Sequence, residues 1–136
     1  MITYNENENT IVDCLIFIES FEIFEDGERK LILTTDKQFN QIYNSVYELF
    51  LSSRLMPAFG VSLHDETLNE ITKGDWLQIN FKKEMNKNGL PFNSLLFKIE
   101  EVNGFNLIRL YENKYDGRCL YLDLNEIVNL KHLLKK

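Results

Sequence analysis

Lys98, Arg109, Tyr111 and Tyr121 are the residues of this chain whose types could do chemistry together. An ammonium group, a guanidinium fork and two phenols are suited to binding a phosphate or carboxylate that carries a stacking base. Arg and Tyr are also residue types that dominate protein interfaces. The four residues lie in three different predicted strands, so the strand register decides whether they meet.

Two predicted turns set that register. Asn103-Gly104 is a strong signal for a tight type I′ turn, because this turn needs positive φ at both central residues. The turn pairs Ile99 with Ile108 across the hairpin. A longer turn over residues 113–117 then places Ile108 opposite Leu122. A slip of one residue in either hairpin would move every side chain to the other face.

This register gives the predicted sheet one apolar face and one mixed face. The apolar face is expected to form the core and carries Leu95, Phe97, Ile99, Ile108, Leu110, Leu120 and Leu122. The mixed face carries Leu96, Lys98, Glu100, Phe105, Leu107, Arg109, Tyr111, Cys119, Tyr121 and Asp123. On the mixed face, Lys98, Arg109 and Tyr121 become lateral neighbours about 5 Å apart, and Tyr111 lies two residues along from Arg109.

The mixed face has three interpretations. In the first, Glu100 and Asp123 neutralise Lys98 and Arg109 by cross-strand pairing on a half-hydrated sheet. In the second, the face is a protein interface, and its apolar contact residues are Leu96, Phe105, Leu107 and Cys119. In the third, the Lys, Arg and Tyr side chains bind a small anionic, nucleotide-like ligand.

No sequence signature supports an enzyme. The chain has no GxSxG motif, no paired carboxylates in a recognisable frame, and no HxxxH, HxH or CxxC spacing for a metal. We therefore expect no catalytic residue, no metal and no cofactor, and we keep an enzyme that uses His64 or Cys119 as an alternative. Cys14 and Cys119 are too few for a disulfide framework and are expected to be reduced, small apolar residues.

The predicted elements indicate an α+β fold with a mainly antiparallel sheet. Residues 10–24 and 29–35 form an N-terminal hairpin around an Asp26-Gly27 turn. The first strand of this hairpin is apolar on both faces and would have to be covered on both. Four strands between residues 76 and 124 form a C-terminal meander, and the connection over residues 84–91 is expected to be a polar loop.

Three helices complete the predicted fold. Thr35 and Gln38 are typical of a capping box and begin a long helix with one broad apolar stripe. The residues of this stripe are Phe39, Ile42, Tyr43, Val46, Tyr47 and Phe50. A short helix capped by Ser62 is expected from about Asp65 to Lys73, and a C-terminal helix is expected to begin at Asn125.

Composition limits the class of protein. The 136 residues are 44% hydrophobic and 26% charged, which predicts one globular domain over residues 11–136 after a flexible arm of residues 1–10. The net charge of −6 argues against general nucleic-acid binding, which depends on Lys and Arg neutralising phosphates. No run approaches the roughly eighteen apolar residues of a membrane span, so we expect a cytoplasmic protein without a membrane partner.

We therefore expect a non-enzymatic protein that acts by binding a protein partner and forms a homodimer. The dimer contact would be the mixed face or the doubly apolar first strand. Small acidic proteins without catalytic motifs are often immunity proteins, antitoxins or phage-encoded inhibitors, which is an analogy of class and not of residues. The alternative is a module that binds a small anionic ligand on Lys98, Arg109, Tyr111 and Tyr121.

Overall fold

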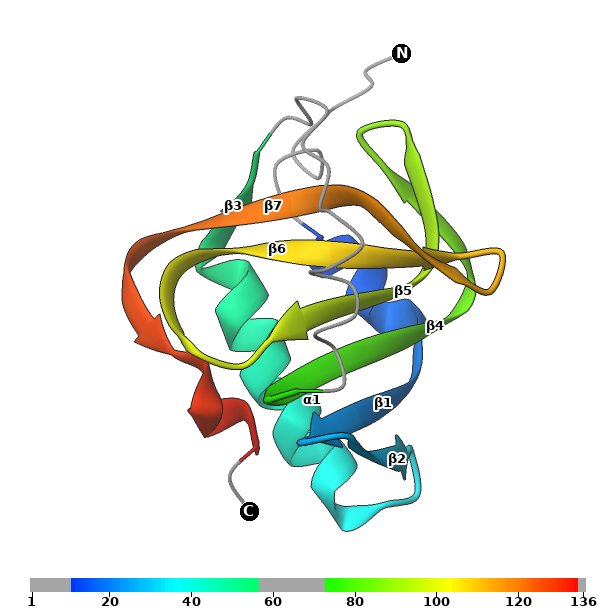
Figure 1. The fold of residues 1–136 in the computed structure, drawn as a ribbon, viewed down its shortest axis with the longest axis vertical. Helices are drawn as coiled ribbons and strands as arrows, with labels where there is room; N and C mark the ends of the chain where they lie inside the picture. Colours follow the sequence, from blue (N-terminus) through cyan, green and yellow to red (C-terminus); the bar gives the residue numbers. More distant parts are fainter. Residues whose placement is uncertain (1–10, 57–72, 135–136) are drawn as a thin grey trace.

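The computed structural model describes residues 11–56 and 73–134 of the protein (Figure 1). In these parts, one α-helix packs on a seven-stranded sheet whose neighbouring strands are all antiparallel, in the order β2-β1-β4-β5-β6-β7-β3. The strands are β1 (Ile18–Glu25), β2 (Glu28–Leu33), β3 (Ser53–Leu55), β4 (Asp75–Lys87), β5 (Leu90–Lys98), β6 (Glu101–Tyr111) and β7 (Lys114–Asn129). The helices are α1 (Lys37–Leu51) and two 3-10 helices, η2 (Val12–Phe17) and η4 (Leu130–Leu134).

The mainly antiparallel sheet and the long helix confirm the predicted α+β class. β1 and β2 form the N-terminal hairpin, and Asp26 and Gly27 in its turn have φ of 49° and 89°, as a type I′ turn requires. β4 to β7 are consecutive neighbours in the sheet, which is the predicted meander. The predicted N-terminal arm, the short helix after Ser62 and His64 all lie outside the described residues.

α1 covers one face of the sheet because its sequence is apolar on a single side. Asp36 caps the helix, and its carboxylate accepts a 2.9 Å hydrogen bond from the N–H of Gln38. The cap therefore lies one residue after the predicted Thr35. The residues that α1 buries are Phe39, Ile42, Val46, Leu49 and Phe50. We call the sheet face under α1 the inner face, which carries the main core, and the opposite face the outer face. In the described ranges, no helix has both the length and the apolar character needed to cross a bilayer.

Residues 11–18 contain a 3-10 helix where a strand was predicted. Ile11, Cys14, Leu15 and Ile18 are all buried. Their spacing of i, i+3, i+4 and i+7 is typical of a helix and not of a strand. The apolar character on two faces therefore reflects a helical turn that packs on the main core, and β1 begins only at Ile18.

The end of the chain is a strand where a helix was predicted. β7 continues to Asn129, and Val128 pairs there with Val102 of β6. Only Leu130–Leu134 form a helix, the 3-10 helix η4, and its Leu130 side chain is buried. The strand is favoured because β6 offers ladder partners along its first residues, which the predicted turn would have removed.

The predicted turn at Asn103-Gly104 is wrong, because both residues lie inside β6. The chain turns instead at residues 99–100, between β5 and β6. Two-residue turns with positive φ lie at Asn88-Gly89, between β4 and β5, and at Glu112-Asn113, between β6 and β7. The first of these replaces the polar loop predicted over residues 84–91, and the second replaces the longer turn after Asn113.

The shifted turn exchanges the two faces of β6. Leu96 pairs with Ile108, whereas the predicted partner of Ile108 was Ile99. An offset by an odd number of residues turns each side chain of one strand to the other face. Phe105 and Leu107, which were predicted on the mixed face, therefore lie in the main core, and Ile108 lies on the outer face.

Gly104 has a packing role in place of the predicted turn role. A Cβ atom at this position would lie 2.7 Å from Cζ of Tyr121 and would overlap the phenolic oxygen. Glycine inside a strand often marks such a close approach of a neighbouring group. Gly104 is therefore explained by the phenolic end of Tyr121 and not by backbone reversal.

Candidate functional site

The structure does not bring Lys98, Arg109, Tyr111 and Tyr121 together. Their partners on the neighbouring strands are Trp76 for Lys98, Leu95 and Asp116 for Arg109, Lys114 for Tyr111 and Asn106 for Tyr121. Tyr111 instead lies near Glu84, whose charge raises the pKa of the phenol. A ligand role for the four residues stays a prediction, but the lateral contact on which it was based does not form.

Arg109 is a buried cross-link between β5, β6 and β7. Only 2% of the residue is exposed. Its Nε donates a 2.8 Å hydrogen bond to the carbonyl of Arg118, and Nη1 donates one of 2.5 Å to the carbonyl of Pro91. Nη2 lies 3.1 Å from Oδ2 of Asp116. The N–H of Arg118, helped by the Arg109 charge, lowers the pKa of that carboxylate. All three guanidinium nitrogens are therefore engaged within the chain.

The four residues predicted for a protein interface are buried within the chain. Phe105 and Leu107 belong to the main core, and Leu96 and Cys119 belong to a second apolar cluster on the outer face. The cluster also contains Phe24, Trp76 and Ile108. An interface role for the four residues stays a prediction, and their burial already gives each of them a packing role.

A polar network crosses the outer face beside this second cluster. Glu22 pairs with Gln78 and Ser20 pairs with Asn80 between β1 and β4, and Asn80 pairs with Ser94 of β5. The Gln78 amide donates a 2.9 Å hydrogen bond to Glu22. The Asn80 amide donates to both Glu22 and Ser20 at 3.0 Å. The Ser94 hydroxyl donates to Asn80 at 2.7 Å, so side chains from three strands are joined.

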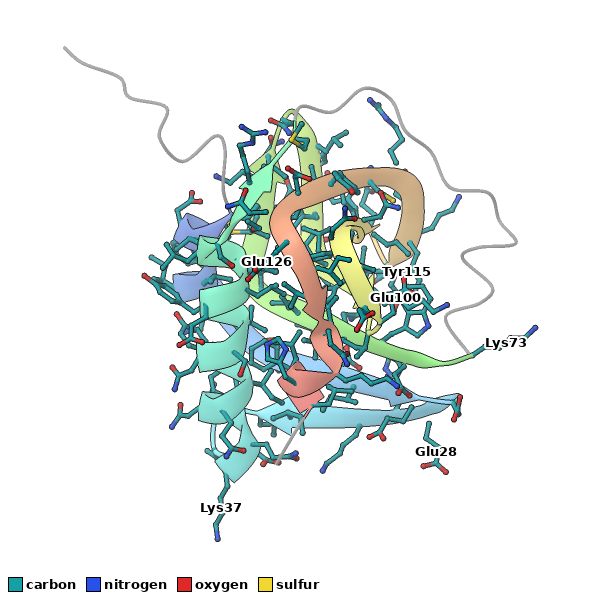
Figure 2. All side chains as sticks on the ribbon, turned by 90° about the vertical axis from the view of Figure 1, so that its left-hand side faces the viewer. Glu28, Lys37, Lys73, Glu100, Tyr115 and Glu126 are labelled. Carbon is teal, nitrogen blue, oxygen red and sulfur yellow. The ribbon has the colours of Figure 1, made fainter. Side chains whose placement is uncertain are left out.

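Two further side chains on the outer face extend the network at its two ends. Tyr115 of β7 lies on the side of the sheet away from α1 (Figure 2) and donates its hydroxyl to Oε1 of Gln78. β5 and β6 lie between these two strands, so the contact requires a concave outer face. At the other end, Nε of Arg29 donates to Glu22, and the guanidinium carbon lies 5.1 Å from the centroid of the Phe24 ring.

The charged and titratable side chains of the network interact with one another. Glu22 accepts hydrogen bonds from Arg29, Gln78 and Asn80. The bond to Glu22 raises the pKa of Arg29. Burial raises the pKa of Tyr115, and the charge of Arg29 partly opposes this shift. In the described ranges no buried side-chain nitrogen or oxygen lacks a hydrogen-bond partner. Such a network stiffens the sheet and specifies its register.

Neither a metal-binding cluster nor a readily ionised thiol is found among the described residues. No three His, Cys, Asp or Glu side chains among them gather as a metal site requires. Cys14 and Cys119 are both buried and not in disulfides, and burial raises the pKa of their thiols to about 12 and about 11. A thiol with so high a pKa is a poor nucleophile at neutral pH, because the thiolate is the reactive form.

The exposed apolar residues of edge strand β2 form the candidate functional surface. Leu31 and Leu33 are 52% and 51% exposed and lie on the outer face, opposite Glu22 and Ser20 of β1. The Arg29 side chain, 54% exposed, lies on the same face and is held by Glu22. In Figure 2 the hairpin of β1 and β2 is the lowest part of the sheet. We call Arg29, Leu31 and Leu33 the β2 edge site.

Both the network and the β2 edge site were missed by sequence reasoning. The network leaves a signal, since Ser20 and Glu22, like Gln78 and Asn80, are polar at alternate positions of otherwise apolar strands. That signal does not say which strands pair. The edge site leaves no local signal, because only the strand order shows that β2 is an edge.

Comparisons with known proteins identify no family for this chain. No protein-family model matches it, and neither a curated protein nor a solved structure does. The side chains and strand edges described above are therefore the basis for the function.

Proposed function

We propose that the chain is a non-enzymatic binding protein that recognises another protein chain through the β2 edge site. The binding mode is strand addition, in which an extended segment pairs with an exposed sheet edge. Main-chain hydrogen bonds supply part of the affinity in this mode, and apolar side chains at alternate positions supply the rest. An immunity, antitoxin or inhibitor role would use such a site, and this class remains an analogy.

The observation that carries this proposal is the half-exposure of Leu31 and Leu33 on an edge strand. Native sheets commonly protect their edges with proline, bulges, charge or a covering element. β2 has no proline, and its pairing with β1 has no bulge. Its charged residues Glu28, Arg29 and Lys30 occupy the first half of the strand, and the leucines lie in the second half. Two neighbouring leucines on such an edge are expected to meet apolar side chains of a partner strand.

The rest of the outer face supports binding over catalysis. Glu22 and Tyr115 are the ionisable groups of the network besides Arg29, and both are engaged by hydrogen bonds. A general base must reach a proton of the substrate, and both carboxylate oxygens of Glu22 already accept hydrogen bonds within the chain. The network instead holds Arg29 in place beside the two leucines.

The proposal is tested by native mass spectrometry of the protein after gentle purification from the cells that make it. The parent is expected to carry additional mass of another polypeptide above its own 16.1 kDa. Leu33→Lys replaces an apolar side chain of the β2 edge site by a charged one. The fraction of protein that carries the additional mass is expected to fall at least tenfold. The control Leu51→Lys changes another leucine, 62% exposed on α1, and is expected to keep it.

Two outcomes would contradict the proposal. One is a parent protein that carries no second polypeptide under these conditions. The other is a Leu33→Lys protein that retains its partner as well as the Leu51→Lys protein does.

A further inference from the structure

We infer that the β2 edge site binds a second copy of this chain, strand to strand. The two β2 strands run antiparallel about a two-fold axis at Leu31, and the sheet continues from one copy into the other. This inference rests on the proposed function, because it names the polypeptide that the site binds. A two-fold contact of this kind uses the same surface on both copies.

The β1–β2 turn determines which backbone groups of β2 point outward. With a two-residue turn, the flanking Glu25 and Glu28 form a hydrogen-bonded pair, and such pairs alternate along the ladder. The N–H and C=O groups of Arg29, Leu31 and Leu33 therefore point away from β1. Among the described strands, none lies on that side of β2. The Leu33 carbonyl already accepts a hydrogen bond from the N–H of Asp36. The other five groups form a template for an added strand.

An axis at Leu31 places compatible side chains opposite one another. On the outer face, Leu31 meets its own copy and Arg29 meets Leu33. On the other face, Lys30 meets Ile32. No two charges of the same sign are directly opposite in this register, and like charges at such positions are unfavourable. The leucines of both copies then form one continuous apolar strip across the junction.

Neighbouring registers are less favourable. An axis at Lys30 places two ammonium groups directly opposite each other. An axis at Ile32 depends on the carbonyl of Leu33 as an acceptor, and that carbonyl already accepts a 2.9 Å hydrogen bond from the N–H of Asp36. The axis at Leu31 forms its central hydrogen bonds without that carbonyl.

The charges of the edge favour a second copy over an acidic partner strand. Arg29 is paired with Glu22, and Lys30 donates a 2.9 Å hydrogen bond to Oε1 of Gln38. Arg29 is therefore neutralised within the chain, and Lys30 is held by a neutral amide. The site instead needs backbone groups and apolar side chains at alternate positions, which β2 of a second copy supplies.

The test is a charge swap at the two-fold axis, measured by analytical ultracentrifugation of the recombinant protein alone. The parent is expected to move from 16.1 kDa towards twice that mass as its concentration rises. Leu31→Lys and Leu31→Glu each place like charges opposite one another and are expected to remain monomeric. Their equimolar mixture is expected to recover the dimer, because opposite charges then meet. The control Leu51→Lys is expected to dimerise as the parent does.

Several outcomes overturn the inference. The inference is overturned if the parent stays monomeric up to about 1 mM, because even weak specific interfaces associate at that concentration. A Leu31→Lys protein that dimerises like the parent also overturns it, as does an equimolar mixture that stays monomeric. If thermal unfolding shows that the variants do not fold, amide exchange of the parent decides. Exchange at Leu31 and Leu33 must then slow with concentration, and unchanged exchange overturns the inference.

The two proposals can fail separately. A recombinant protein that is monomeric, together with a native complex that Leu33→Lys dissolves, refutes the second copy and leaves strand addition by another protein. Loss of both results refutes the β2 edge site as a binding surface.

Discussion

Gly104 lies against the phenolic end of Tyr121, and a Cβ atom there would overlap this end unless the Tyr121 side chain moved. Gly104→Ala is expected to lower the free energy of unfolding by about 0.5–1.5 kcal/mol, because the added methyl group forces the Tyr121 side chain out of its present rotamer. Urea denaturation of the single variants and of the double variant with Tyr121→Ala measures this. The penalty should largely disappear in the Tyr121→Ala background, since the overlapping group is then absent.

Gly89 is the matched control for this experiment. It has a φ of 77°, and a Cβ atom there would meet nothing within 4 Å. Gly89→Ala is expected to cost about 1 kcal/mol through backbone strain alone. Removing Tyr121 should leave that cost unchanged. Equal coupling of both glycines to Tyr121 would contradict the packing role of Gly104.

The buried Arg109 side chain is expected to stabilise the fold through its hydrogen bonds to neighbouring strands. Arg109→Met removes three engaged nitrogens and leaves the carbonyls of Pro91 and Arg118 without their donor. We expect a loss of about 2–5 kcal/mol in the free energy of unfolding. The control Arg118→Met changes an exposed arginine and is expected to cost less than about 0.5 kcal/mol. Similar denaturation midpoints for the two variants would show that the buried fork contributes little.

At the scale of elements, the polar network joins β1, β2, β4, β5 and β7 on the outer face. The chain brings its partners from positions far apart, since Ser20 and Asn80 are separated by 60 residues and Gln78 and Tyr115 by 37. Each bond restricts the register of two strands at once. The network therefore favours one alignment of β1 on β4, which also sets the exposed face of β2.

Tyr115 gives the network a dependence on pH. Burial raises its pKa above the ordinary 10.0, so the folded state holds the proton more tightly than the unfolded state does. The resulting stabilisation is fully present below pH 10 and is lost as pH rises through the folded-state pKa. Tyr115→Phe is expected to cost about 1 kcal/mol at neutral pH. Its difference from the parent should shrink in alkali.

Urea denaturation of the parent and Tyr115→Phe at pH 7 and at about pH 11 measures this difference. The other tyrosines are common to both proteins and cancel in the comparison. A difference that is constant between the two values would show that Tyr115 does not titrate with folding.

At the scale of the whole molecule, one curved sheet separates the two apolar clusters formed by residues 11–56 and 73–134. α1, η2 and η4 contribute to the inner cluster, and the ring of Tyr115 packs on the outer one. The two edges of the sheet are unequal, because β3 has three residues and β2 has six. β2 is therefore the longer edge for an added strand, and the charge-swap experiment at Leu31 tests that consequence of the topology.

The sequence by itself determined the elements whose signals are local. The apolar stripe from Phe39 to Phe50 predicts α1, and Asp26-Gly27 predicts the first hairpin, because periodicity and turn chemistry act within a few residues. Segments that alternate or run apolar predict the meander strands as well. The α+β class follows from the order of these elements.

Only the tertiary structure decided the register of the strands, the sheet face on which each residue lies, and which strands are edges. An Asn-Gly pair has the same letters whether it reverses the chain, as at Asn88-Gly89, or lies against a distant side chain, as Gly104 does. Which occurs depends on contacts with a distant strand, and one odd offset changes which residues are buried. The pairing of distant strands places Arg109 where it links three strands, and it places Leu31 on an edge strand. The candidate site thus depends on long-range pairing, which no local pattern specifies.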